Sequence, residues 1–329
     1  MKKIKVIEMG GTISGYGKSR LDLKDYISGI YCGEDFLKAM PEIDEIADVS
    51  FESFLRVSST KINSDHWIQL RQKVMSCLFQ EDFDGIIITH GTNTLEESAY
   101  FLHLTVPTEK PIIFVGAQRP FTALSSDAHL NLLNAIRVAA SDEAQNKGVL
   151  VLLNDEISSA REVTKTNTYR VEAFQSGQFG YLGFIDPDNK VQFYRQPTRK
   201  HTVNSEFSSL DFTELPDVEI VFSYAGATGH LIDHITESKK YSGIITAGTG
   251  AGLISPSEIE ALKRATDNGL FIVRSSRVGN GRVVPIDSYK DYNFISGDNL
   301  LPQKARILLM LSLLKYNSLR DIQTVFDDY

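Results

Sequence analysis

Apolar residues gather in several short runs along the chain, and polar, helix-forming stretches separate most of these runs. The apolar runs are residues 4–9, 85–90, 111–116, 148–153, 219–224, 243–248 and 271–276. Runs of this length that are rich in valine and isoleucine predict β-strands, and continuous rather than alternating hydrophobicity predicts strands covered on both faces. Helical spacing is found at residues 64–80, 94–105, 127–141, 256–268 and 302–315. The pattern predicts a mostly parallel α/β sheet flanked by helices.

One segment, residues 187–216, loses this alternation of strands and helices and carries three of the ten prolines. It is typical of a hairpin followed by an interdomain linker. A chain of 329 residues also exceeds the roughly 250–300 residues at which a single core stops growing. We therefore predict a larger N-terminal α/β domain at residues 1–205, a linker at 206–216 and a smaller C-terminal α/β domain at 217–329.

Composition narrows the class of partner. The net charge is -8 and no long basic run occurs, so the sequence gives no support to a nucleic-acid or anionic-membrane partner. The two cysteines, Cys32 and Cys77, form no metal-binding spacing and are expected to be reduced thiols. No run approaches the ~18 apolar residues of a membrane span, and residues 4–9 lead into Gly-Gly as a strand does, unlike a secretion signal. We expect a cytoplasmic enzyme or binding protein whose partner is a small molecule or another protein.

Polar residues cluster where predicted strands end, at "MGGTISGYGKS" (9–19), "THGTNTLEES" (89–98) and "NDEISSAREVTKTNTYR" (154–170). Open α/β sheets bind their ligands at the carboxyl ends of the strands, so these clusters are candidate binding loops. The first is glycine-rich, but it matches neither the dinucleotide fingerprint nor the P-loop. Its simplest structural interpretation is a tight turn in which Thr12 caps a helix. Residues 15–19 lack apolar periodicity and predict a mobile lid.

The other two clusters also have structural interpretations. Thr94 with Glu97 three residues later is typical of a capping box, which leaves Thr92 and Asn93 to face a ligand. Lys165, taken alone, is most simply a solvated surface charge. Asp127, in "FTALSSDAHLN", is most simply the N-cap of the next helix.

Taken together, the clusters resemble the bacterial-type L-asparaginase/glutaminase family, and the resemblance runs from residue 10 to residue 314. The segments that carry it are "MGGTISG", "IITHGTNTLEESAYFL", "VGAQRP", "LNDEISSAREVTKTNTYR", "RKHT" and "VRSSRV". The resemblance implies a two-domain α/β homotetramer whose active sites lie at subunit interfaces. It also implies hydrolysis of a side-chain amide through an acyl-threonine intermediate, with release of ammonia and with no cofactor or metal.

The resemblance also implies roles for individual residues. Thr12 matches the nucleophile and Tyr26 the lid tyrosine that contacts it, while Thr92 and Lys165 match a second threonine and its lysine partner. A threonine hydroxyl is a weak nucleophile and needs a base. Lysine can act as that base only if burial lowers its pKa. The predicted substrate-binding set is Gly11, Ser59, Thr60, Gly91 and Asn93.

The sequence departs from the family pattern around the substrate's amine. The family normally reads HGTDT, so Asn93 removes a negative charge that would face both the substrate's α-ammonium and the lysine. A charge-assisted hydrogen bond becomes a neutral one, roughly half as strong. Thr60 and Lys61 stand where many members have Gln-Asp, Ala251 stands where an asparagine is common, and residues 278–288 offer no obvious glutamate.

Three hypotheses follow from these departures. The protein is an asparaginase with a rearranged amine pocket that uses Asp127 or Asp287; or it hydrolyses a related carboxamide that lacks a free α-ammonium; or it is a catalytically impaired trap or binding protein. Retention of Thr12, Tyr26, Thr92 and Lys165 argues against the third hypothesis.

Overall fold

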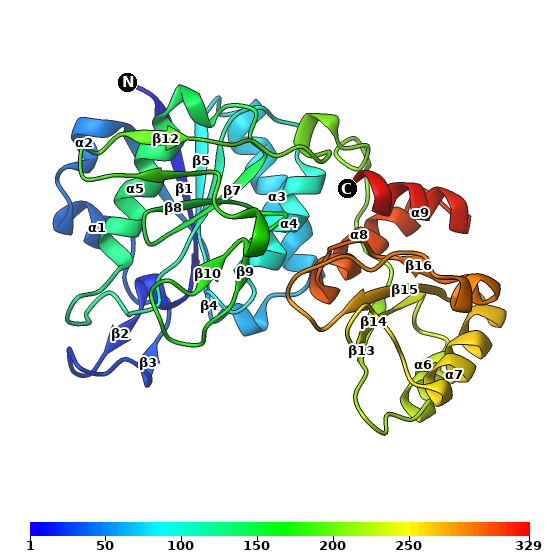
Figure 1. Cartoon of the computed structure of the whole chain (residues 1–329). Helices are drawn as coiled ribbons and strands as arrows, with labels where there is room; N and C mark the ends of the chain where they lie inside the picture. Colours follow the sequence, from blue (N-terminus) through cyan, green and yellow to red (C-terminus); the bar gives the residue numbers. More distant parts are fainter. The chain divides into compact units, whose positions relative to one another are not determined.

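The structure is a computed structural model that describes residues 1–329, and it divides into two compact units, Met1–Asp211 and Phe212–Tyr329 (Figure 1). Residues 206–217 contain no helix or strand. In the first unit, strands with helices on both sides form the larger body. In the second, a smaller sheet carries its own helices. The two-domain α/β class predicted from the sequence is confirmed.

The first unit is built on an eight-stranded sheet in the order β12-β11-β8-β7-β6-β5-β1-β4. The strands are β1 (Lys3–Gly10), β4 (Asp48–Val57), β5 (Gly85–Thr89), β6 (Ile112–Val115), β7 (Val149–Leu153), β8 (Glu156–Ser159), β11 (Gly183–Ile185) and β12 (Val191–Phe193). The strands β4, β1, β5, β6 and β7 are parallel to one another, and β8, β11 and β12 extend the sheet beyond β7 in antiparallel pairs. Every residue of β5, β6 and β7 is buried, as their continuous hydrophobicity predicts.

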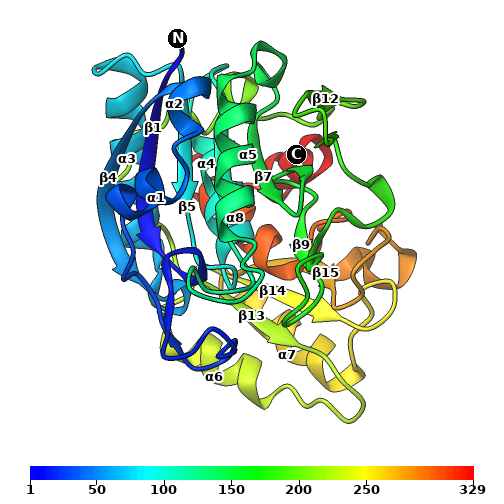
Figure 2. The same cartoon turned by 90° about the vertical axis from the view of Figure 1, so that its left-hand side faces the viewer.

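Helices cover both faces of this sheet. α3 (Ser64–Phe79) and α4 (Leu95–Thr105) lie on one face, and α1 (Gly33–Ala39), α2 (Ile43–Ile46) and α5 (Ala128–Ala140) lie on the other (Figures 1 and 2). Two short antiparallel ribbons stand at the end of the sheet where β1 ends (Figure 1). They are β2 (Tyr16–Gly17) with β3 (Tyr26–Ile27), and β9 (Thr164–Lys165) with β10 (Phe174–Gln175).

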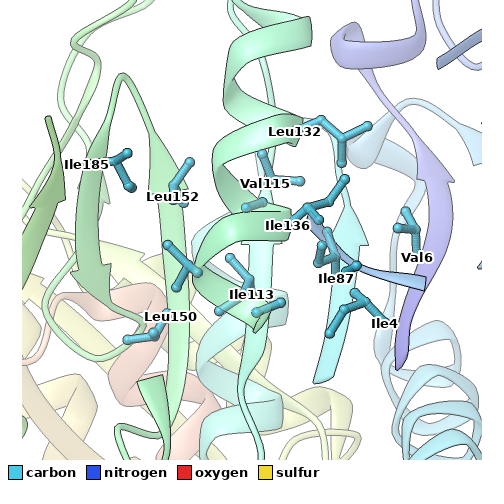
Figure 3. Close-up of a cluster of buried hydrophobic side chains, with 14 of the residues drawn as sticks. Ile4, Val6, Ile87, Ile113, Val115, Leu132, Ile136, Leu150, Leu152 and Ile185 are labelled. Atoms are coloured by element: carbon cyan, nitrogen blue, oxygen red, sulfur yellow. The ribbon is translucent and has the colours of Figure 1, made fainter. Parts of the chain in front are cut away.

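The core under α5 explains how this helix is held on the sheet. Leu132 and Ile136 point from α5 toward Ile87, Ile113 and Val115 of the central strands (Figure 3). All five side chains are fully buried. Their burial fixes the start of α5, and with it the loop that joins β6 to α5.

The second unit has a parallel sheet in the order β13-β14-β15-β16. Its elements are β13 (Val218–Phe222), α6 (His230–Ser238), β14 (Gly243–Gly248), α7 (Pro256–Asp267), β15 (Phe271–Ser276), β16 (Ile295–Ser296), α8 (Pro302–Leu313) and α9 (Leu319–Asp328). No helix of the protein combines the length and the apolar character that crossing a membrane requires.

The longest strand, β4, is absent from the strands predicted by hydrophobic runs. Its sequence, DVSFESFLRV, interleaves polar residues, and its residues are half-buried or exposed. It lies at an edge of the sheet and pairs only with β1, so it needs no continuous apolar run.

The α5 core gives a stability prediction. We expect Ile136→Ala to lower the free energy of unfolding by about 2–5 kcal/mol, because it removes a buried side chain and leaves a cavity. Leu130→Ala is the matched control on the same helix: Leu130 is 50% exposed, and we expect a change within about 0.5 kcal/mol. Urea unfolding followed by circular dichroism measures both variants, and equal losses would contradict the proposed packing.

Candidate active site

The polar loops at the carboxyl end of the large sheet surround a cavity of about 570 Å³. It is lined by residues from all three sequence clusters and from the loop after β6. The predicted site residues among its lining are Gly11, Thr12, Tyr26, Ser59, Gly91, Thr92, Asn93 and Lys165. Thr60 is the exception: it is exposed, and its hydroxyl lies 3.0 Å from that of Ser58.

Two glycines let the loops after β1 and β5 approach each other. Gly11 has a φ of 87°, a conformation that other residues rarely adopt, and a side chain there would collide with the backbone of Gly91. A Cβ on Gly91 would in turn lie 2.7 Å from the Ser59 Oγ. The absence of both side chains places Thr12 and Thr92, which follow these glycines, on the wall of one cavity.

Thr12 contacts the tyrosine of the β2–β3 ribbon. Its Oγ1 lies 2.6 Å from the hydroxyl oxygen of Tyr26. Thr12 is the first residue of a short 3-10 helix, Thr12–Ser14, whose N-cap is Gly11, so the interpretation of Thr12 as a helix cap is wrong. Its buried hydroxyl is directed to Tyr26 instead.

The stretch expected to form a lid belongs to this ribbon, whose strand β2 pairs with β3. The loop between β6 and α5 holds it in place: the Thr122 hydroxyl accepts a hydrogen bond from the Gly17 amide at 3.0 Å. The amide of Leu124 donates to the carbonyl of Arg20 at 2.8 Å. The position of Tyr26 therefore depends on a loop that is distant in sequence, and the mobility of residues 15–19 stays a prediction.

Thr92 contacts the lysine of the β9–β10 ribbon. The Nζ of Lys165 donates to the Oγ1 of Thr92 at 2.8 Å. Burial lowers the pKa of Lys165 below its ordinary value, while the nearby carboxylate of Glu96 acts in the opposite direction. A lowered pKa increases the fraction of neutral lysine, which is the form able to accept a proton.

Glu96 is a site residue that the sequence interpretation missed. It lines the cavity, is only 6% exposed, and accepts hydrogen bonds on Oε1 from the Thr164 hydroxyl at 3.0 Å and the Lys165 amide at 3.4 Å. It therefore links the first turn of α4 to the segment that carries Lys165. A glutamate in the first turn of a helix is an ordinary placement, so the sequence offered no signal for this role.

Ser59 is held against the turn that contains Asn93. Its Oγ accepts from the Asn93 amide at 3.2 Å, and its carbonyl accepts from the Thr94 hydroxyl at 2.8 Å. The capping box predicted for Thr94 and Glu97 is therefore wrong: Thr94 occupies the N-cap position, but its hydroxyl does not cap the helix. A hydroxyl can bond to another segment as well as to its own helix, and here the long-range partner is used.

Family descriptions match both units of the chain. "Asparaginase, N-terminal" matches residues 3–199, and "Glutaminase/Asparaginase C-terminal domain" matches residues 217–326. This chain belongs to the asparaginase family.

Relatives of this asparaginase-family chain match over nearly their full lengths. L-asparaginase 2 of Bacillus subtilis is 41% identical, over 100% of this chain and 87% of the relative. Glutaminase-asparaginase of Pseudomonas fluorescens is 39% identical, over 100% and 91%. The crystal structure of the probable cytoplasmic L-asparaginase from Campylobacter jejuni superposes with a TM-score of 0.95 at 41% identity, and each chain is covered completely. The resemblance predicted from the sequence is confirmed.

Two aspartates were candidates for the amine pocket of this asparaginase-family protein. Asp127 stands at the N-cap position of α5, but its carboxylate accepts the backbone amides of Gln118 and Arg119, each at 2.9 Å, and does not line the cavity. Asp287 is an exposed residue of the second unit, which also contains Ala251. Glu96 is the only carboxylate in the lining, beside the cations Lys24 and Lys165.

His90 is buried and forms a hydrogen bond to the Gly91–Thr92 turn. The Gly91 carbonyl can only accept, so the Nδ1 of His90 donates to it at 2.8 Å. The Nε2 of the neutral ring then accepts from the Ser98 hydroxyl at 2.9 Å, and this hydroxyl accepts from the Trp67 indole at 2.9 Å. Complete burial lowers the pKa of His90 to about 4, so the ring is neutral and holds one tautomer.

The lowered pKa of His90 makes the stability of the fold depend on pH. Between pH 6.5 and about 4 the unfolded state binds a proton at this residue and the folded state does not, so acidification destabilises the fold by up to roughly 1.4 kcal/mol per pH unit. His90→Gln loses the hydrogen bonds at neutral pH but also loses this acid penalty. We expect the stability gap between wild type and variant to narrow from pH 7 to pH 4.5.

Urea unfolding at several pH values measures this gap. The control is His230→Gln, which replaces an exposed histidine, and its gap is expected to stay constant. A gap that widens on acidification in His90→Gln would sink the assignment of a neutral, buried His90.

Proposed function

We propose that this protein hydrolyses the side-chain carboxamide of asparagine or a close relative to the acid and ammonia, through an acyl-threonine intermediate. One observation carries the proposal. A single cavity contains two hydroxyls that each have a proton-transferring partner: Thr12 with Tyr26 at 2.6 Å, and Thr92 with Lys165 at 2.8 Å. Covalent catalysis requires such a hydroxyl and a group that removes its proton.

The reaction uses these pairs in sequence. The Thr12 Oγ1 attacks the carboxamide carbon while its proton passes to the Tyr26 oxygen, and Tyr26 gives its own phenolic proton to the leaving nitrogen. The carbon–nitrogen bond then breaks, ammonia leaves with that proton, and an ester to Thr12 remains. The Thr92 hydroxyl takes a proton from the water that attacks this ester and passes its own to the neutral Nζ of Lys165; the ester bond breaks, the acid is released, and a proton returns from Lys165 through Thr92 to the Thr12 oxygen. The lowered pKa of Lys165 suits it to that step.

The names of the relatives favour this function over the other two hypotheses. The Bacillus subtilis protein is named L-asparaginase 2. An Escherichia coli protein has the same name and is 39% identical, over 100% of this chain and 94% of the relative. Asn93 contributes a neutral amide to the cavity lining where the family normally has an aspartate. Glu96 is the only carboxylate in that lining, so we assign it as the group that binds a substrate's α-ammonium in this unit.

We also propose a homotetramer with active sites at subunit interfaces, and a cytoplasmic location. The family resemblance supports the tetramer. Free thiols at Cys32 and Cys77 and the name of the Campylobacter jejuni relative support the cytoplasm. A relative of Haemophilus influenzae that is 38% identical is named as periplasmic, so the two kinds of location occur among similar chains. Light scattering on the purified protein tests the oligomer.

The nucleophile gives a direct prediction. Thr12→Ala is expected to reduce ammonia release from asparagine at least ~1,000-fold, because the covalent route is lost, while the protein remains folded. Thr60→Ala is the matched control: it removes an exposed hydroxyl outside the cavity, and we expect kcat/KM within about twofold of wild type.

Ammonia release from asparagine, glutamine, succinamic acid and an N-acyl asparagine measures both variants and the substrate class. Preference of the wild type for a substrate without a free amine would replace asparagine in the proposal. Full turnover by Thr12→Ala would overturn the role of Thr12.

A further inference from the structure

The cavity contains a buried amide that the proposed reaction does not use. Gln118 lines the cavity, is only 8% exposed, and its Nε2 has no hydrogen-bond partner in the protein. Other buried amides have partners: the Nδ2 of Asn131 donates to the Gly116 carbonyl at 3.0 Å, and that of Asn134 donates to Asp155 at 2.7 Å. Native proteins pair nearly all buried polar groups, so the unpaired amide of Gln118 calls for a ligand.

The position of Gln118 is fixed independently of its side chain. Its backbone amide donates to Asp127, and the Asn131 side chain donates to the same carboxylate oxygen at 3.2 Å. Two residues earlier, a Cβ on Gly116 would lie 3.0 Å from the Thr92 Cγ2, which shows that the loop starts against the catalytic turn. The backbone contacts of this loop therefore place the Gln118 side chain at the cavity, where its Nε2 makes no hydrogen bond within the protein.

The chemistry of the unpaired atom defines what it binds. A side-chain N–H is a donor only, so its partner is an acceptor such as a carboxylate or carbonyl oxygen. The proposed substrates carry such oxygens, and the lining contains two lysines but one carboxylate, which also favours an oxygen-bearing, anionic group.

We propose that Gln118 is a specificity-determining residue whose Nε2 donates a hydrogen bond to an oxygen of the bound carboxamide substrate. This inference rests on the proposed function and adds a substrate contact to it. A site built to hydrogen-bond its substrate discriminates strongly, because a poorly matched ligand leaves the buried donor unpaired.

Two substitutions separate this role from a structural one. Gln118→Met keeps the length of the side chain but removes the donor, and Gln118→Glu keeps the shape but replaces the donor with an anionic acceptor. We expect kcat/KM for asparagine to fall about tenfold in the first and about 100-fold in the second. The ligand-free Tm of Gln118→Met is expected to equal or exceed that of wild type, because an unpaired buried amide is removed.

Asn134→Leu is the matched control, since Asn134 is a buried amide with partners outside the cavity. Its Tm is expected to fall while kcat/KM stays within about twofold of wild type. The proposal is overturned if Gln118→Met retains kcat/KM within twofold, or if its activity falls only together with its Tm.

Calorimetric binding of L-asparagine separates this proposal from the proposed function. If the wild type binds asparagine but releases no ammonia, the proposed function fails, and tenfold weaker binding by Gln118→Met still supports the contact, while equal binding overturns it. If the wild type binds none of asparagine, glutamine, succinamic acid and the N-acyl asparagine, both proposals are overturned.

Discussion

The active site depends on how closely two backbones approach. Gly11 and Gly91 follow strands β1 and β5, which are neighbours in the parallel sheet, and neither position has room for a side chain. Parallel strands end at the same edge of a sheet, so their following loops start side by side. The glycines then close the remaining distance, and the two threonines that follow them share one cavity.

Other contacts in the first unit hold this arrangement in place. His90 hydrogen-bonds to the Gly91 carbonyl, and the buried Ser59 accepts hydrogen bonds from Asn93 and Thr94 of the same turn. Glu96 joins α4 to the segment that carries Lys165. The loop after β6 both carries Gln118 and hydrogen-bonds to the ribbon that carries Tyr26.

The sequence predicts those parts of the structure that have a local signal. Continuous apolar runs mark the buried central strands, and the motifs around Thr12, Thr92 and Lys165 mark the site. Where the signal is not local, prediction fails. β4 is an edge strand without an apolar run, and the Thr94 hydroxyl bonds to Ser59, which is 35 positions away. Glu96 and Gln118 enter the site through tertiary contacts, and nothing in their immediate sequence separates them from ordinary helix and loop residues.

We propose that Thr12, and not Thr92, forms the covalent bond to the substrate. Thr92 is the competing nucleophile because the Lys165 Nζ lies 2.8 Å from its hydroxyl. Acid quenching of the enzyme during turnover of a slow ester or amide analogue, followed by peptide mass spectrometry, identifies the acylated residue directly. We predict an acyl group on Thr12. An acyl group on Thr92 with Thr12 unmodified would contradict it.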